Sequence, residues 1–185
     1  MQVYNAKDMA RSFRTVRDNT IKIAEEIPEE QYAFRPAPGS HSVAETLAHI
    51  AVATRFPQRL HGDRMTAVDF AFFSAAFPRI LQQEAELTTK AQILDALRRG
   101  GAEFTGWLET LSDETLAERI QFPSPMQPPT KTRFEMLLAS KEHEMHHRGQ
   151  LMVIERMLGM VPHLTRDFEA RRAQMQQQQQ AGAGA

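Results

Sequence analysis

Two histidines lie four residues apart inside a segment with the apolar pattern of a long helix. His143 and His147 belong to a stretch that repeats apolar residues every three or four positions, from about residue 132 to 159. On a helix, side chains four residues apart share one face, so both imidazoles take places on a core-facing apolar stripe. Buried polar groups need partners. The spacing therefore predicts two ligands of a divalent metal ion.

A third ligand should come from the inward face of another helix. His49 is the best candidate, because it shares a predicted helical face with the apolar residues Val52, Ala53, Phe56 and Leu60. The remaining histidines lie at predicted helix ends or off the His143 face, namely His41, His61, His146 and His163. Three imidazoles do not fill a four-coordinate shell, so we expect an open position on the metal.

Three charged residues near these histidines are candidates for a role in chemistry. Glu45 lies one turn before His49 and Glu144 flanks His143, so either could orient an imidazole or accept a proton. Glu45 also ends the capping box Ser42-Val-Ala-Glu45, and that structural role is the favoured one. Arg148 could pair with a substrate carboxylate, or with Glu144 one turn earlier on its own helix.

Four long segments carry the period of amphipathic helices, at about residues 5–27, 42–60, 89–111 and 132–159. Neither strand-like alternation nor a glycine-rich nucleotide loop is present, which favours an all-α, four-helix bundle with short extra helices in the connections. The aromatic-rich insertion at 65–82, closed by Pro78, should hold one or two short helices. Its phenylalanines could fill the core, form a dimer surface or wall a metal pocket: Phe70, Phe72, Phe73 and Phe77.

The backbone connections carry further expectations. Pro57 could kink or shorten the second helix, and Gly100-Gly101 suggests a kink or a close helix contact in the third. The proline-rich stretch 121–130 should be irregular. We expect one metal-binding domain over residues 1–164 and a disordered glutamine-rich tail over 165–185.

Composition narrows the partners that we expect. The 185 residues have a formal net charge of -1, which provides no basic surface for nucleic acid, so we predict no nucleic-acid partner. No apolar run is long enough to span a membrane, and the N-terminus lacks a signal pattern, so we expect a cytoplasmic protein without a membrane partner. The absence of cysteine excludes disulfides, thiolate ligands and a cysteine nucleophile.

Two phrases give the chain a family resemblance: His143-Glu-x-x-His147-Arg-Gly-Gln-Leu151, and Ala44-Glu-Thr-Leu-Ala-His49-Ile50. Together they resemble the DinB/YfiT-like family of four-helix-bundle metalloproteins, which is unrelated to the DNA polymerase that shares the DinB name. The resemblance covers about residues 5–162. It implies that His49, His143 and His147 hold Zn, Ni, Mn or Fe, and that the protein is a homodimer. Some relatives are transferases or isomerases that use a low-molecular-weight thiol such as bacillithiol, mycothiol or glutathione.

Three functional hypotheses remain open from the sequence. The first is a metal-dependent enzyme that acts on a small molecule and transfers a small-molecule thiol. The second is metal-dependent hydrolysis by an activated water. The letters His143-Glu144-x-x-His147 also fit the zincin pattern of metalloproteases with glutamate as general base, which is the disfavoured interpretation. The elongated form of that pattern fails, since Gly149 comes one place early and position 153 is valine. The third is a non-catalytic bundle with a structural or vestigial metal.

Overall fold

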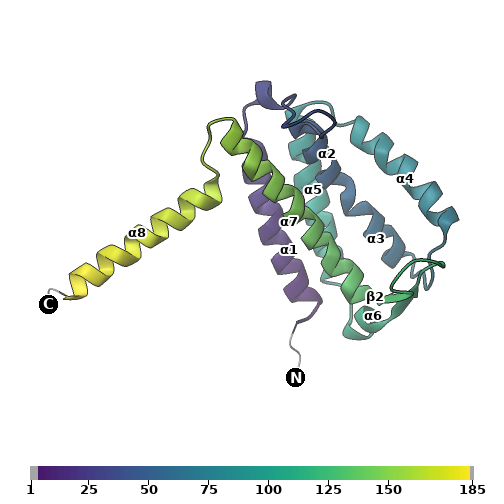
Figure 1. Cartoon of the computed structure of the whole chain (residues 1–185). Helices are drawn as coiled ribbons and strands as arrows, with labels where there is room; N and C mark the ends of the chain where they lie inside the picture. Colours follow the sequence, from purple (N-terminus) through teal and green to yellow (C-terminus); the bar gives the residue numbers. More distant parts are fainter. Residues whose placement is uncertain (1–3, 184–185) are drawn as a thin grey trace.

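Four helices surround the main core of the chain: α1 (Ala6–Glu26), α2 (Val43–Ala53), α5 (Lys90–Leu108) and α7 (Arg133–Met157). The structure is a computed structural model that describes residues 4–183. Helices α1 and α2 each pack against both α5 and α7, so the four helices form a closed ring around the core (Figure 1). The predicted all-α, four-helix bundle is confirmed.

Each bundle helix begins with a reciprocal capping box. The predicted boxes are present at α2, α5 and α7, and α1 has one as well: Ser42/Glu45, Thr89/Gln92, Thr132/Glu135 and Asn5/Asp8. In each, the first side chain accepts a hydrogen bond from the backbone amide three residues on, and the second accepts one from the capping residue's amide. These contacts fix where each helix starts and hence which face it turns inward.

The connection between α2 and α5 differs from our expectation. The second predicted helix is broken at Thr54 into α2 and α3 (Arg55–Gly62), and Pro57 lies in the first turn of α3, where proline is tolerated. The insertion forms one 16-residue helix, α4 (Phe70–Ala85), which passes through Pro78 instead of ending there. Helix α4 packs on α2 and α3, outside the ring of four (Figure 1).

A short hairpin precedes α7, although we expected no strands. After α6 (Asp113–Ala117), strand β1 (Arg119–Gln121) pairs antiparallel with β2 (Thr130–Thr132), enclosing most of the proline-rich stretch. Strands of three residues are too short to produce a readable alternation in the sequence. The single-turn 3-10 helix η1 (Glu29–Gln31) lies in the connection between α1 and α2.

The close helix contact predicted at Gly100-Gly101 is confirmed. A Cβ atom on Gly101 would lie 2.7 Å from Cγ of Arg17, and one on Gly100 would lie 3.1 Å from the carbonyl oxygen of Ala51. The two glycines therefore let α5 approach both α1 and α2 closely, and α5 runs through them without interruption.

The C-terminal segment is the helix α8 (His163–Ala183), where we expected a disordered tail from residue 165. Figure 1 shows α8 extending away from the bundle, and residues 166–180 are exposed. Glutamine and alanine are good helix formers, which explains helical structure in a segment with little apolar surface to bury. Among the described residues, no helix combines the length and apolar composition needed to cross a bilayer.

Candidate metal centre

The three histidines predicted as metal ligands come together between α2 and α7. Nε2 of His49 lies 3.1 Å from Nε2 of His143, and Nε2 of His147 lies 3.2 Å from the same atom. One ring nitrogen from each residue lies within 4.8 Å of the other two. His49 and His143 are 94 positions apart, so only the packing of α2 on α7 creates this cluster.

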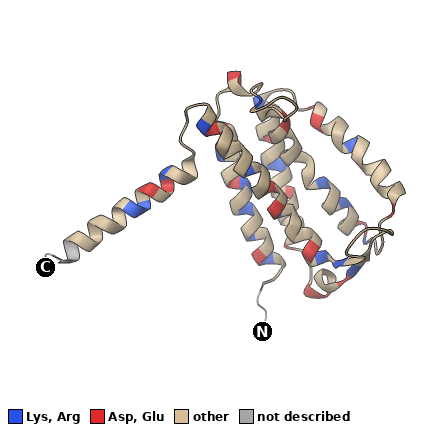
Figure 2. Ribbon diagram, in the orientation of Figure 1, with Lys and Arg blue, Asp and Glu red and all other residues tan. Residues whose placement is uncertain are grey.

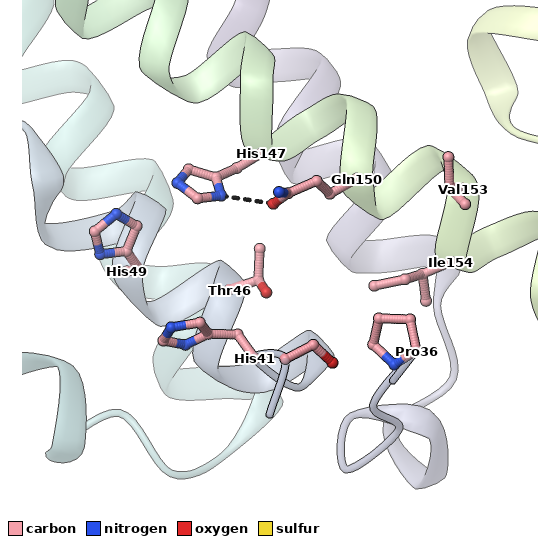
Figure 3. A pocket seen from close by; sticks show the side chains of 9 residues that line it. Pro36, His41, Thr46, His49, His147, Gln150, Val153 and Ile154 are labelled. Carbon is pink, nitrogen blue, oxygen red and sulfur yellow. Dashed lines mark hydrogen bonds between the residues drawn. The ribbon is translucent and has the colours of Figure 1, made fainter. Parts of the chain in front are cut away.

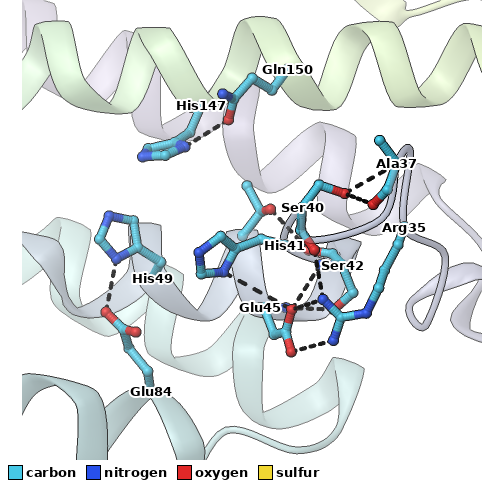
Figure 4. A network of polar contacts seen from close by, with 11 residues as sticks. Arg35, Ala37, Ser40, His41, Ser42, Glu45, His49, Glu84, His147 and Gln150 are labelled. Atoms are coloured by element: carbon cyan, nitrogen blue, oxygen red, sulfur yellow. Dashed lines mark hydrogen bonds and ion pairs between the residues drawn. The ribbon is translucent and has the colours of Figure 1, made fainter.

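Two of the three rings are oriented by hydrogen bonds through their other nitrogen. Nδ1 of His49 lies 2.8 Å from Oε1 of Glu84, and Nδ1 of His147 lies 2.8 Å from Oε1 of Gln150 (Figure 4). Carboxylate and carbonyl oxygens accept, so both Nδ1 atoms carry the proton and both Nε2 atoms present a lone pair. The amide nitrogen of Gln150 in turn donates to Nε2 of His146, which fixes the orientation of the glutamine.

The geometry fits a bound divalent cation. Nε2 of His143 carries at most one proton, which it can donate to only one neighbour. The lone pairs on Nε2 of His49 and Nε2 of His147 therefore cannot both accept a hydrogen bond within the cluster. Tetrahedral zinc with Zn–N bonds of about 2.0–2.1 Å separates its nitrogen ligands by about 3.3 Å, close to the observed spacing. In metal sites, the histidine nitrogen that does not bind the metal usually donates to a carboxylate or carbonyl oxygen, as Nδ1 of His49 and Nδ1 of His147 do here.

The protonation states of the cluster are compatible with metal binding. Burial, and then the neighbouring imidazoles of His147 and His49, lower the pKa of His143 to about 4. Burial also lowers the pKa of His147, although the hydrogen bond that His147 donates to Gln150 acts in the opposite direction. Both rings are therefore neutral near pH 7, which is the form that ligates a metal.

Glu84 and Gln150 are site residues that our sequence analysis did not identify. Glu84 lies on α4, which we expected to end at Pro78, and its closeness to His49 depends on the packing of α4 on α2. Gln150 lies three residues after His147 on α7, within the quoted motif, so helical spacing alone offered a signal for it. No comparable signal in the sequence marks Glu84.

In the structure Glu144 is paired with Arg17, and it forms no hydrogen bond with the three histidines among the described residues. Its carboxylate accepts hydrogen bonds from Nε and Nη2 of Arg17 at 2.9 Å each, and both side chains are almost fully buried. A general base must be free to accept the proton of a metal-bound water, whereas both oxygens of this carboxylate already accept hydrogen bonds from Arg17. The proposed role of Glu144 as a base or imidazole partner is therefore not supported, and the metalloprotease hypothesis loses its general base.

The other two charged candidates, Glu45 and Arg148, form no hydrogen bond with the three histidines among the described residues. Glu45 caps α2 through the amide of Ser42 and forms an exposed ion pair with Arg35, the structural role that we favoured for it (Figure 4). The Arg35 hydrogen bond is the largest cause that lowers the pKa of Glu45 to about 2. Arg148 is partly buried, forms no hydrogen bond with any described residue, and lines neither of the two cavities beside the cluster.

Two cavities border the histidine cluster. One, of about 430 Å³, is lined by His49, His147 and Gln150, with apolar walls from Val153, Ile154 and Pro36 (Figure 3). His41 and Thr46 lie on the same cavity. The other, of about 450 Å³, is lined by His49 and His143 and by α3, α4 and α7. Both volumes lie in the range of small-molecule sites.

The aromatic insertion serves two of the three roles considered for it, as core filler and as the wall of a pocket. Phe77 lines the second cavity together with Phe56 of α3, as expected for the wall of a pocket. Phe72 and Phe73 pack instead on the small core around Leu60, Val68 and Ile120. Phe70 is exposed on the surface of α4.

Comparison with known proteins agrees with this architecture. The sequence model of the DinB superfamily matches residues 12–151, which include all three histidines of the cluster. The chain belongs to the DinB superfamily. The family predicted from the histidine phrases is therefore confirmed, and this DinB-like protein has a three-histidine cluster that could hold a metal.

Individual relatives support the same fold. The uncharacterised protein YjoA of Bacillus subtilis is 29% identical over 148 residues, which cover 80% of this DinB-like chain and 86% of YjoA. The YjoA crystal structure superimposes with a TM-score of 0.62 at 22% identity, covering 83% of this chain and 92% of YjoA. YfiT of Bacillus subtilis, reported as a probable metal-dependent hydrolase with an unusual four-helix-bundle topology, superimposes with a TM-score of 0.63 at 17% identity and covers 84% and 88%.

One further relative corrects our exclusion of nucleic acid. The colibactin self-resistance protein ClbS was crystallised in complex with double-stranded DNA, and it superimposes with a TM-score of 0.62 at 12% identity, covering 84% of this chain and 98% of ClbS. In the DinB-like chain, residues of both charges are distributed over the helices (Figure 2), in line with the net charge of -1. The exclusion was based on the net charge and on the lack of a basic stripe, and a neighbour of the same fold that is seen with DNA makes that prediction wrong. The expected homodimer stays a prediction.

Proposed function

We propose that this protein is a divalent-metal-dependent enzyme that acts on a small molecule. His49, His143 and His147 would hold the metal, with one position left for a water or a small-molecule thiol. The observation that carries the proposal is the position of the cluster between two cavities of about 430 and 450 Å³, so that reactants can approach the three nitrogens. A purely structural metal site is normally closed by four protein ligands.

The chemistry follows from the residues that face the cluster. When bound, the metal would lower the pKa of a coordinated water to about 7, or hold a thiol as its nucleophilic thiolate. Glu84 and Gln150 keep His49 and His147 in the tautomer that directs Nε2 inward. His41 lines the same cavity as His49 and His147, with its Nδ1 4.0 Å from Glu45, so it is placed to exchange a proton with a reactant there.

The lining of the first cavity supports a small substrate with apolar bulk. Val153, Ile154 and Pro36 supply apolar surface, whereas Gln150, His41 and Ser40 supply polar contacts at separate points. Such a combination orients a small molecule more readily than an extended peptide. The report of YfiT as a probable metal-dependent hydrolase adds support for hydrolysis as one of the two reactions.

Substitution with cobalt tests the proposal directly. Purified protein loaded with Co(II) is titrated with a small thiol while the absorption spectrum is recorded, and is then assayed with ester substrates and with thiol-transfer substrates. A sulfur-to-cobalt charge-transfer band that grows with thiol, with turnover in the transfer assay, supports thiol activation; ester turnover without this band supports water activation. His147→Ala should abolish either result, whereas His146→Ala should preserve it. Stoichiometric cobalt with neither band nor turnover would favour the alternative, a non-catalytic bundle.

A further inference from the structure

Helix α4 has little buried surface for its length. Of its 16 residues only Ala76 is buried, whereas the 11-residue α2 has seven buried residues. Phe77 and Leu81 of α4 are 52% and 62% exposed. A helix in a globular protein owes most of its stability to the packing of its apolar face, and elements with few buried contacts open at a low free-energy cost. Packing on the bundle therefore holds α4 less firmly than it holds the four core helices.

Two contacts on one face of α4 connect it to the neighbouring helices. The ring centroid of Phe77 lies 5.9 Å from that of Phe56 on α3, with the ring planes 10° apart. One end of the helix is joined to α2, because Oε1 of Glu84 accepts a hydrogen bond from Nδ1 of His49 at 2.8 Å (Figure 4). Phe77 and Glu84 are seven residues apart and so share a helical face. The position of this face therefore affects a predicted metal ligand.

The second cavity, of about 450 Å³, is lined by α4 and by α7. Both helices contribute apolar side chains to it: Phe77, Ile80, Leu81, Met136 and Ala139. His49 and His143 line the same cavity. Its volume suits a small molecule, since even two turns of an α-helix, about 10 Å across and about 11 Å long, take up more space.

We propose that the second cavity binds the apolar part of a small aromatic or aliphatic substrate, and that this ligand and the metal strengthen each other's binding through Glu84. A molecule in the cavity would contact both α4 and α7 and cover apolar surface on each. Burial of this surface stabilises the position of α4 seen here, in which Glu84 accepts from His49. That hydrogen bond orients the His49 ring toward the metal.

The coupling acts in both directions. A metal held by His49 fixes its ring, and the hydrogen bond to Glu84 then favours the same position of α4. Coupling between two binding sites is reciprocal, so the apolar ligand and the metal must raise each other's affinity by the same factor. The inference rests on the proposed metal site, because the coupling requires a metal at His49.

Binding of naphthalene to the metal-free protein is the first test. This hydrocarbon has no atom that ligates a metal, and calorimetry measures its dissociation constant. Ala139→Trp, which fills the cavity, should weaken binding at least tenfold, whereas Ala102→Trp, the same change at an exposed position on α5, should not. In the wild type, NMR signals of the Ile80 and Leu81 methyl groups should shift on addition of naphthalene, and this measurement needs no variant. Equal affinities in the two variants, unshifted methyl signals or no binding by the wild type would refute the proposal.

The coupling is the second test. The dissociation constant of Zn(II) is measured by chelator competition with and without saturating naphthalene, and that of naphthalene with and without Zn(II). Each should fall about tenfold when the other partner is bound. The coupling factor should drop to about one in Glu84→Ala, whatever the affinity of this variant for either partner alone, and stay near ten in Glu86→Ala, an exposed change near the end of α4.

The possible failures are distinguishable. Zinc binding that naphthalene does not change, or coupling that persists in Glu84→Ala, overturns this inference and leaves the proposed metal site intact. A wild-type protein that binds no zinc overturns the metal site, and the inference with it.

Discussion

Arg17 on α1 and Glu144 on α7 form an almost completely buried ion pair, with Nη2 of Arg17 2.9 Å from Oε2 of Glu144. Arg17 also donates to the carbonyl oxygens of Leu97 on α5 and Ile50 on α2, so one guanidinium from α1 contacts the three other helices of the bundle. Glu144 directly follows His143 in the chain. The ion pair therefore helps to hold the helix that carries two of the three predicted ligands.

We predict that Glu144→Ala lowers the free energy of unfolding by about 3–5 kcal/mol, because it leaves the charge of Arg17 buried without its partner. Denaturant unfolding measures this loss, and Glu142→Ala is the matched control, since Glu142 is an exposed neighbour on the same helix. Metal content per folded molecule should stay unchanged in both variants. A Glu144→Gln variant that kept its stability but lost activity would instead indicate a catalytic base.

We predict that Gly101→Ala destabilises the protein by about 1–3 kcal/mol, because the new methyl group would overlap Cγ of Arg17. Arg17 cannot move aside easily, since its guanidinium is held by Glu144 and Leu97. Gly106→Ala on the same helix is the control. No atom lies within 4 Å of its added Cβ, so this change should stabilise the helix by about 0.5–1 kcal/mol. Equal effects of the two substitutions on the unfolding midpoint would argue against the close contact.

We predict about one divalent metal per chain, lost on substitution of His49 or His147 by alanine. Each of these changes removes one of the three converging nitrogens. Elemental analysis after gel filtration measures the stoichiometry. His146→Ala should retain the metal, because Nε2 of His146 bonds to the amide of Gln150 and does not face the cluster. Equal metal loss in His146→Ala and His147→Ala would exclude this ligand assignment.

We predict that Glu84→Ala weakens metal binding about 10–100-fold, because the carboxylate that orients the His49 ring is lost. Competition with a chromophoric chelator measures the dissociation constant. Glu84→Gln keeps an acceptor oxygen without the charge and should have an intermediate effect. Glu86→Gln, which changes an exposed residue near the end of α4, is the control. If Glu84→Ala bound the metal as tightly as this control, Glu84 would have no role in the site.

We predict that stability falls as the pH rises through the titration of Glu155. Both of its carboxylate oxygens are buried without a hydrogen-bond partner among the described residues, and burial, then the charge of Glu26, raises its pKa from 4.5 to about 7. Between these two values the folded state binds more protons than the unfolded state, so the free energy of unfolding decreases from pH 4.5 to about 7 and then levels off.

Thermal or denaturant unfolding between pH 4 and 8 provides the test. Glu155→Gln should flatten this part of the stability curve and exceed the wild type in stability at pH 8, because no buried carboxylate then has to ionise. Glu169→Gln, an exposed change on α8, should leave the slope as in the wild type. A wild-type slope that survives in Glu155→Gln would assign the pH dependence to another group.

The sequence by itself determined the elements that depend on local periodicity and local hydrogen bonding. The predicted capping boxes begin α2, α5 and α7, and the four-residue step of His143 and His147 placed both on one helical face. The inward position of His49 followed from the same rule applied to α2. These features are readable because helix geometry relates residues three and four positions apart, whatever the rest of the chain does.

Only the tertiary structure decided which groups meet across helices. Glu84 reaches His49 because α4 packs on α2, and Glu144 turns to Arg17 although its place beside His143 suggested a role at the metal. His61 looked like an ordinary residue at a helix end until Arg133, 72 positions later, fixed its tautomer. Such contacts depend on how whole helices pack, and packing is a collective property of many side chains that no local spacing encodes.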